Sequence, residues 1–187
     1  MCSCSHIVSF LHSLNVDVVL FDYSGFGFSV DRQDSYSPNC LTNDTLLVIQ
    51  YLQETFLKVP GGLESRKRLY VYGHSLGAVI AMRAVASLQS TVAGLIIEGS
   101  FAQASAIAPI PYWLSWCLGL DAKYRPQYYL SRVTCPVLFA HSIDNQLIPS
   151  SQSHILAGQR PVYYLRGSHA SPCYDERYAQ ELLRFIG

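Results

Sequence analysis

The chain has 187 residues, of which 50% are hydrophobic and 14% are charged, and its formal net charge is zero. This length is typical of one domain with a substantial core, and the composition excludes an intrinsically disordered protein. A neutral chain gives no electrostatic reason to expect a nucleic-acid partner, because such binding depends on Lys and Arg residues that neutralise phosphates. We interpret the basic cluster at 66–68 as a solvated entry to a strand.

The cysteines and the N-terminus contain no metal-binding or export signal. The six cysteines, at positions 2, 4, 40, 117, 135 and 173, lack the paired spacing of a zinc site, so we predict reduced thiols and no metal. The N-terminus lacks the basic segment and long apolar run of a secretory signal, and no apolar run is long enough to span a bilayer. These features favour a cytoplasmic protein. They leave a membrane surface open as a partner and the oligomeric state undetermined.

The first third of the chain predicts a helix, a strand and a second helix. Apolar residues recur at helical spacing over 5–14. The continuous apolar run at 17–22 is typical of a strand buried on both faces, and it leads into a glycine-containing loop at 23–29. Thr42 or Asn43 is the expected cap of a helix that extends to Leu57.

The remaining chain predicts four more strands, at 68–72, 93–97, 137–141 and 162–165, with helices at 78–86 and 174–186. Strands that alternate with helices indicate a mostly parallel sheet flanked by helices, the α/β class, in a single domain over 1–187. The segment 102–134, rich in Pro, Tyr and Trp, interrupts this alternation. We predict that it is a cap over an apolar acyl or aryl ligand; the alternative is a pair of helices that pack on the sheet.

The most informative motif is Gly73-His74-Ser75-Leu76-Gly77, which lies between a predicted strand and a predicted helix. This is the setting of a nucleophile elbow, where a strained turn exposes the serine hydroxyl above the sheet. We expect the two glycines to prevent a collision between strand and helix. The Leu76 amide, at the helix N-terminus, is the predicted oxyanion-hole donor. The alternative is a glycine-containing turn without catalytic function.

A serine nucleophile needs a histidine base and an acid that orients the base. His169 directly follows the last predicted strand and is preferred to His141, which ends the preceding strand, and to His74, which adjoins the serine. For the acid we favour Asp144, which lies just beyond the 137–141 strand, over Glu98 at the end of the 93–97 strand. The non-catalytic alternative for Asp144 is a cap of the following helix.

These residues, together with Asp22-Tyr23-Ser24-Gly25-Phe26-Gly27-Phe28-Ser29 and Gly167-Ser168-His169, resemble the α/β-hydrolase superfamily. The chain is most similar to α/β-hydrolase-domain lipases, acyl-protein depalmitoylases and serine-peptidase-like hydrolases, from about Ser5 to the C-terminus. The resemblance implies a serine hydrolase that cleaves an ester or thioester with an apolar acyl group and uses no cofactor. In that mechanism Ser75 attacks the carbonyl, His169 takes its proton, Asp144 holds the imidazolium, and water releases the acyl group.

Family members carry further strands before the first helix, and the loop after one of them supplies the second oxyanion-hole amide. Here only Met1–Cys4 precede that helix. By the family's strand order, one further strand would lie between the 17–22 strand and the elbow strand, so we expect an N-terminally truncated α/β-hydrolase fold. The alternative function is a non-catalytic protein that binds a ligand or partner through the same cleft. A peroxidase-like use of the same residues also stays open.

Overall fold

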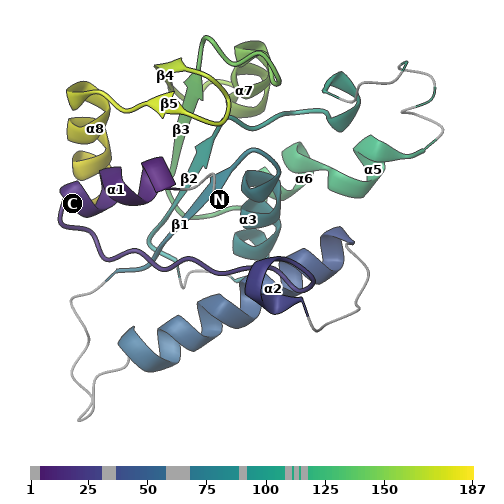
Figure 1. The fold of residues 1–187 in the computed structure, drawn as a ribbon. Coiled ribbons are helices and arrows are strands. Elements are labelled where there is room, and N and C mark those ends of the chain that lie inside the picture. The colour runs from purple at the N-terminus through teal and green to yellow at the C-terminus, as the bar shows by residue number, and fades with distance from the viewer. Residues whose placement is uncertain are drawn as a thin grey trace.

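A central five-stranded sheet organises the computed structural model, which describes residues 5–30, 37–57, 68–88, 92–107, 111, 114 and 118–187 (Figure 1). The strands follow one another across the sheet in chain order: β1 (Tyr70–His74), β2 (Gly94–Glu98), β3 (Val137–Ser142), β4 (Val162–Gly167) and β5 (Pro172–Cys173). The first four are parallel, and β5 pairs antiparallel with β4. The predicted α/β class and four of the predicted strands are therefore confirmed.

The middle of the sheet is buried on both faces, because helices cover both. Every residue of β2 is buried, as expected of a parallel strand between two layers of helices. Leu95 and Ile97 face one apolar cluster, which includes α3 (Leu76–Ser87) and residues from α2 (Pro38–Leu52) and α7 (Ser150–Ala157). Ile96 faces a second cluster, which includes residues of α1 (Ser5–Ser13) and α8 (Glu176–Ile186).

The helix boundaries differ from the sequence prediction where local capping decides them. The α2 helix begins at Pro38 because the Ser37 hydroxyl accepts a hydrogen bond from the Cys40 amide, at 3.2 Å. Pro38 also suits the first helical turn, where an amide hydrogen would have no acceptor. Thr42 and Asn43 are therefore inside the helix and not its cap. A short π-helix, η2 (Gln53–Leu57), follows α2.

The predicted strand at 17–22 is not formed. The chain runs through these residues without strand pairing, and Val19 and Leu20 are 54% and 55% exposed. In the part of the chain that the structure describes, no strand lies beyond the outer edge of β1. A strand needs a neighbour for its backbone groups, so an apolar run alone does not produce one.

The segment predicted as a cap contains η3 (Ala104–Ala106), α5 (Leu120–Tyr124) and α6 (Pro126–Leu130) in its described parts. Leu130 is buried in the core beside α3, and the Arg83 guanidinium lies 4.8 Å from the Tyr129 ring centre. The Asp121 carboxylate accepts hydrogen bonds from the Ser105 amide and hydroxyl, which joins η3 to α5. These contacts place α6 on α3. A cap function stays a prediction, and Tyr112 and Trp113 lie outside the described residues.

Candidate active site

Ser75 lies in a strained turn between β1 and α3. Its φ is +56° and its ψ −125°, a conformation that non-glycine residues rarely adopt. The Ser75 amide donates to the Glu98 carbonyl at 2.9 Å, which fixes the turn to the end of β2. A Cβ on Gly73 would lie 2.4 Å from the Ala78 Cα, so a side chain cannot fit there without movement. A Cβ on Gly77 would meet nothing within 4 Å, so the collision predicted for both glycines is found only at Gly73.

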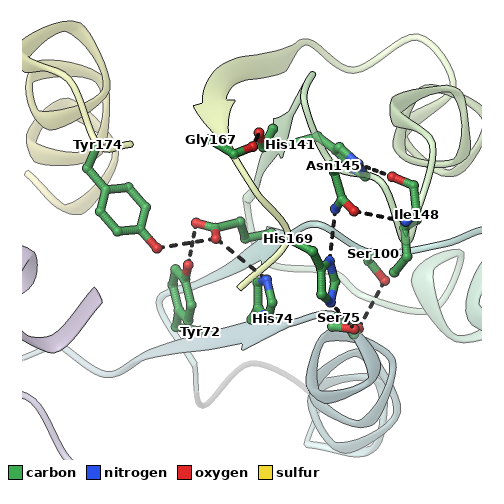
Figure 2. Close-up of polar contacts among 12 residues, drawn as sticks. Tyr72, His74, Ser75, Ser100, His141, Asn145, Ile148, Gly167, His169 and Tyr174 are labelled. Atoms are coloured by element: carbon green, nitrogen blue, oxygen red, sulfur yellow. Dashed lines mark hydrogen bonds and ion pairs between the residues drawn. The ribbon is translucent and has the colours of Figure 1, made fainter. Parts of the chain in front are cut away.

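His169 is brought to Ser75 by the loop that follows β4. Its Nε2 atom lies 3.0 Å from the Ser75 Oγ, within hydrogen-bond distance (Figure 2). Burial lowers the pKa of His169 below its ordinary value, and the nearby His141 lowers it further. The imidazole is therefore neutral near pH 7, and a neutral ring is the form that a general base requires.

Asp144, the predicted acid, points to the start of the His169 loop and not to the imidazole. Its Oδ2 accepts a hydrogen bond from the Gly167 amide at 3.1 Å, and its Oδ1 lies 3.4 Å from Arg166 Nη1. The side chain is 45% exposed. In this structure Asp144 is thus not the residue at Nδ1 of His169, and its role as the acid stays a prediction.

Asn145 occupies that place instead. Its Nδ2 lies 2.8 Å from His169 Nδ1, and its Oδ1 accepts from the amides of Leu147 and Ile148 at 3.0 and 2.9 Å. The side chain is 9% exposed. Asn145 was not among the predicted site residues, because the acid of such a site was expected to be a carboxylate. The available signal was the tendency of Asn to accept from backbone amides two or three residues on, which turns its amide group inward.

Glu98, the alternative acid, belongs to a separate buried cluster. It is 1% exposed and accepts hydrogen bonds from the hydroxyls of Tyr72 at 2.5 Å and Tyr174 at 3.2 Å. Burial raises the pKa of Glu98 to about 7, although both tyrosine hydrogen bonds act in the opposite direction. Its Oε1 lies 3.9 Å from Nε2 of His74, whose pKa is lowered to about 4 by burial first and by His169 second. The structure therefore places Glu98 beside His74.

The third histidine, His141, is a buried residue that holds neighbouring elements together. Its Nδ1 lies 2.6 Å from the Ser153 hydroxyl and its Nε2 2.9 Å from the Ile148 carbonyl, and the ring is fully buried. Both ring nitrogens are thus occupied. His141 serves to connect β3 to α7 and to the loop that carries Asn145.

A cavity of about 510 Å³ opens beside Ser75 and His169. One wall is the apolar run at 19–21, and another is formed by Pro172 and Tyr174 beyond β4.

Leu76 is the first residue of α3, and the first amides of a helix have no acceptor within the helix. Its N–H can therefore donate a hydrogen bond to an oxyanion beside Ser75, and its role as the oxyanion-hole donor stays a prediction. None of the helices in the described ranges is long and apolar enough to cross a membrane.

Sequence comparisons relate the chain to known hydrolases. A family model described as serine aminopeptidase, S33, matches residues 1–160. Among curated relatives, the lysophosphatidylserine lipase ABHD12 of Danio rerio is 28% identical over 156 residues, which cover 74% of this chain and 38% of that protein. Protein bem46 of Schizosaccharomyces pombe is 24% identical over 95% of this chain and 60% of its own length. The chain thus spans between about two fifths and three fifths of these relatives.

Structural comparisons confirm the fold. The monoacylglycerol lipase of Paleococcus ferrophilus superposes with a TM-score of 0.67 at 14% identity, over 98% of this chain and 88% of that chain. The Pyrococcus furiosus esterase Pf2001 also gives 0.67, at 15% identity, over 97% of this chain and 76% of that chain. At such identities the match describes the fold alone.

Proposed function

Because the chain belongs to the serine aminopeptidase S33 family of α/β-hydrolase-fold proteins, we propose that it hydrolyses a carboxylic ester or thioester through Ser75. The observation that carries this proposal is the 3.0 Å approach of Ser75 Oγ to His169 Nε2 at a strained elbow. A serine hydroxyl is a weak nucleophile unless an adjacent base takes its proton. A structural serine would need neither the left-handed backbone nor a half-buried, neutral imidazole beside it.

The reaction follows from this arrangement. The Ser75 Oγ attacks the acyl carbonyl as its proton passes to His169 Nε2, and the tetrahedral intermediate forms next to the Leu76 amide. The imidazolium then protonates the leaving alcohol or thiol. In the second half, water gives a proton to His169 and attacks the acyl-serine; the bond to Ser75 Oγ then breaks, His169 returns the proton to this oxygen, and the acid is released. To stabilise the imidazolium as predicted, the Asp144 carboxylate would have to leave the Gly167 amide and reach Nδ1.

An acyl lipid is the substrate class that the cavity favours. The side chains of Ile7, Leu20 and Phe21 line it together with Ser75, and apolar walls of this kind accept an alkyl chain. The relative from Danio rerio is a lysophosphatidylserine lipase, which supports an acyl ester with a polar leaving group. A series of acyl esters that differ only in the alcohol would identify the leaving group.

A second candidate function is non-catalytic binding through the same cavity. The observation that favours it is the amide of Asn145 at Nδ1 of His169, where the proposed mechanism calls for a carboxylate. The two candidates differ in whether Ser75 is reactive. They agree on the cavity as the place where a ligand binds.

Labelling with a fluorophosphonate probe, which reacts with activated serines, tests the proposal. We expect labelling of the wild-type protein that disappears in Ser75→Ala and in His169→Ala. The matched controls are Ser151→Ala and His154→Ala, both at exposed positions of α7, which should label as the wild type does. Folded protein that does not label would contradict the hydrolase proposal and favour the binding function.

A further inference from the structure

We infer that Asn145 is the positioning residue of His169 and that it holds the imidazole in the tautomer with its proton on Nε2. In this state the ring donates a hydrogen bond to Ser75 and cannot accept the serine's proton. Asn145 would then restrain the rate of the hydrolase, an inference that rests on the proposed function. The inferred tautomer is that of the neutral imidazole before any substrate binds.

The orientation of the Asn145 amide follows from its hydrogen bonds. Its Oδ1 accepts from two backbone amides, those of Leu147 and Ile148. If the group were turned over, its NH₂ would face these two N–H donors, and both amides, of which that of Ile148 is buried, would lose their acceptor. A buried donor left without a partner destabilises the folded state. The loop therefore directs the NH₂ group, not the oxygen, toward His169.

An NH₂ group can only donate, so the Nδ1 atom at 2.8 Å must accept. A neutral imidazole carries one proton, which then lies on Nε2, 3.0 Å from the Ser75 Oγ. To act as a base, the ring must first move this proton to Nδ1, which breaks the bond with Asn145. After the serine's proton has been transferred, the imidazolium would also direct its Nδ1–H at the NH₂ group, donor against donor.

The other groups around the imidazole do not replace the missing carboxylate. The His74 ring lies 4.7 Å away, centre to centre, and the lowered pKa of this histidine leaves it neutral. His141 is also neutral, because burial lowers its pKa, and both of its nitrogens are hydrogen-bonded. Asp144 and Arg166 contact each other, and Glu98 accepts from Tyr72 and Tyr174.

The substitution Asn145→Asp tests the inference directly. The new carboxylate keeps one oxygen on the Leu147 and Ile148 amides and offers the other to Nδ1–H, so the volume changes little. We expect kcat/KM for a p-nitrophenyl acyl ester to rise by about 10²- to 10⁴-fold, since an amide in place of the acid costs a serine protease about 10⁴-fold. We also expect the pH midpoint of the rate to move upward, because a carboxylate raises the pKa of a neighbouring histidine.

Two further variants make the test specific. Asn43→Asp adds the same charge at an exposed position of α2 and should leave the rate within twofold of wild type. Asp144→Asn should lower the rate by less than tenfold, because it loses only the contacts with Gly167 and Arg166. A fall of about 10⁴-fold in Asp144→Asn, or no rise in an active Asn145→Asp, would overturn the inference.

The tautomer itself can be measured without any turnover. In ¹⁵N-resolved NMR spectra of the imidazole groups, assigned with His169→Gln, we expect the proton of wild-type His169 on Nε2 and that of Asn145→Asp on Nδ1. A proton on Nδ1 in the wild type would refute the inference even if the protein is a hydrolase. If neither protein labels or turns over substrate, the proposed function fails while this measurement still decides the role of Asn145.

Discussion

The two flanks of Ser75 are built in different ways. On one flank, β2 and β3 form a paired, buried sheet, and the loops beyond β3 and β4 bring Asn145 and His169 to the serine. On the other flank, residues 16–23 form a wall without strand pairing, and the Phe28 side chain is fully exposed. The nucleophile and base are thus fixed by the sheet, whereas individual side-chain contacts hold the opposite wall. One is the Asp44 carboxylate, which accepts from the Ser24 amide and hydroxyl at 2.8 and 2.9 Å.

The sharpest test of this contrast is the same truncation on each flank. Leu95→Ala, at a fully buried position of β2, should lower the free energy of unfolding by about 2–5 kcal/mol, because it leaves a cavity in the core. Leu20→Ala, at a position that is 55% exposed, should change it by about 0.5 kcal/mol or less. Urea denaturation of both variants measures the difference. Equal losses would mean that the wall is as well packed as the sheet.

The second test concerns the buried carboxyl beside the elbow. The pKa of Glu98 is raised to about 7 from its ordinary 4.5, so the folded state binds the proton more tightly than the unfolded state does. The stabilisation that protonated Glu98 contributes is fully present below pH 4.5. As the pH rises through 7, about 3 kcal/mol of it is lost. Glu98→Gln removes this dependence. The unfolding free energy of wild type minus that of Glu98→Gln should therefore fall by this amount over that range.

His74 also makes the stability depend on pH, and its contribution must be separated from that of Glu98. Its pKa is lowered to about 4, so its contribution to stability is lost as the pH falls below 6.5, which is the opposite sign. Because His74 is present in both proteins, its contribution largely cancels in the difference. A difference that stays constant from pH 4.5 to 7 would show that Glu98 is ionised in the folded protein throughout.

The third test addresses the close approach of strand and helix. Gly73→Ala puts a Cβ 2.4 Å from the Ala78 Cα and should cost about 1–3 kcal/mol of stability, with loss of fluorophosphonate labelling as the elbow shifts. Gly77→Ala is the matched control. Its Cβ meets nothing and alanine favours a helix, so thermal unfolding should occur at the same or a higher temperature. The reverse order of the two midpoints would contradict the packing described here.

The smallest expected effect is on the exposed wall. Asp44→Asn replaces one of the two acceptors for Ser24 by a donor and should cost about 1 kcal/mol. We expect a higher KM for a long-chain ester with little change in kcat, because the proposed substrate would lie against the part of this wall that lines the cavity. A fall in kcat alone would indicate that this wall and the base are coupled.

The sequence predicted the residues that a strong local pattern specifies. The Gly-x-Ser-x-Gly motif, its flanking strand and helix, and a histidine directly after β4 each follow from composition over a few residues, and the structure brings Ser75 and His169 together. The 17–22 run was misread because apolar composition cannot show whether a neighbouring strand is available. The sequence could not show which of Glu98, Asp144 and Asn145 reaches His169, because hydrogen bonds set the direction of each side chain. Glu98 accepts from the Tyr72 hydroxyl, Asp144 from the Gly167 amide and Asn145 from the Leu147 amide.

The loop that holds Asn145 has an evolutionary consequence. Its two backbone donors bind one oxygen, and that oxygen is present in both asparagine and aspartate. The codons of these two amino acids differ by a single base, and their side chains have nearly the same shape. With Asn145 in the role inferred above, one point mutation would therefore convert a restrained serine into an active one, without any repacking of the fold.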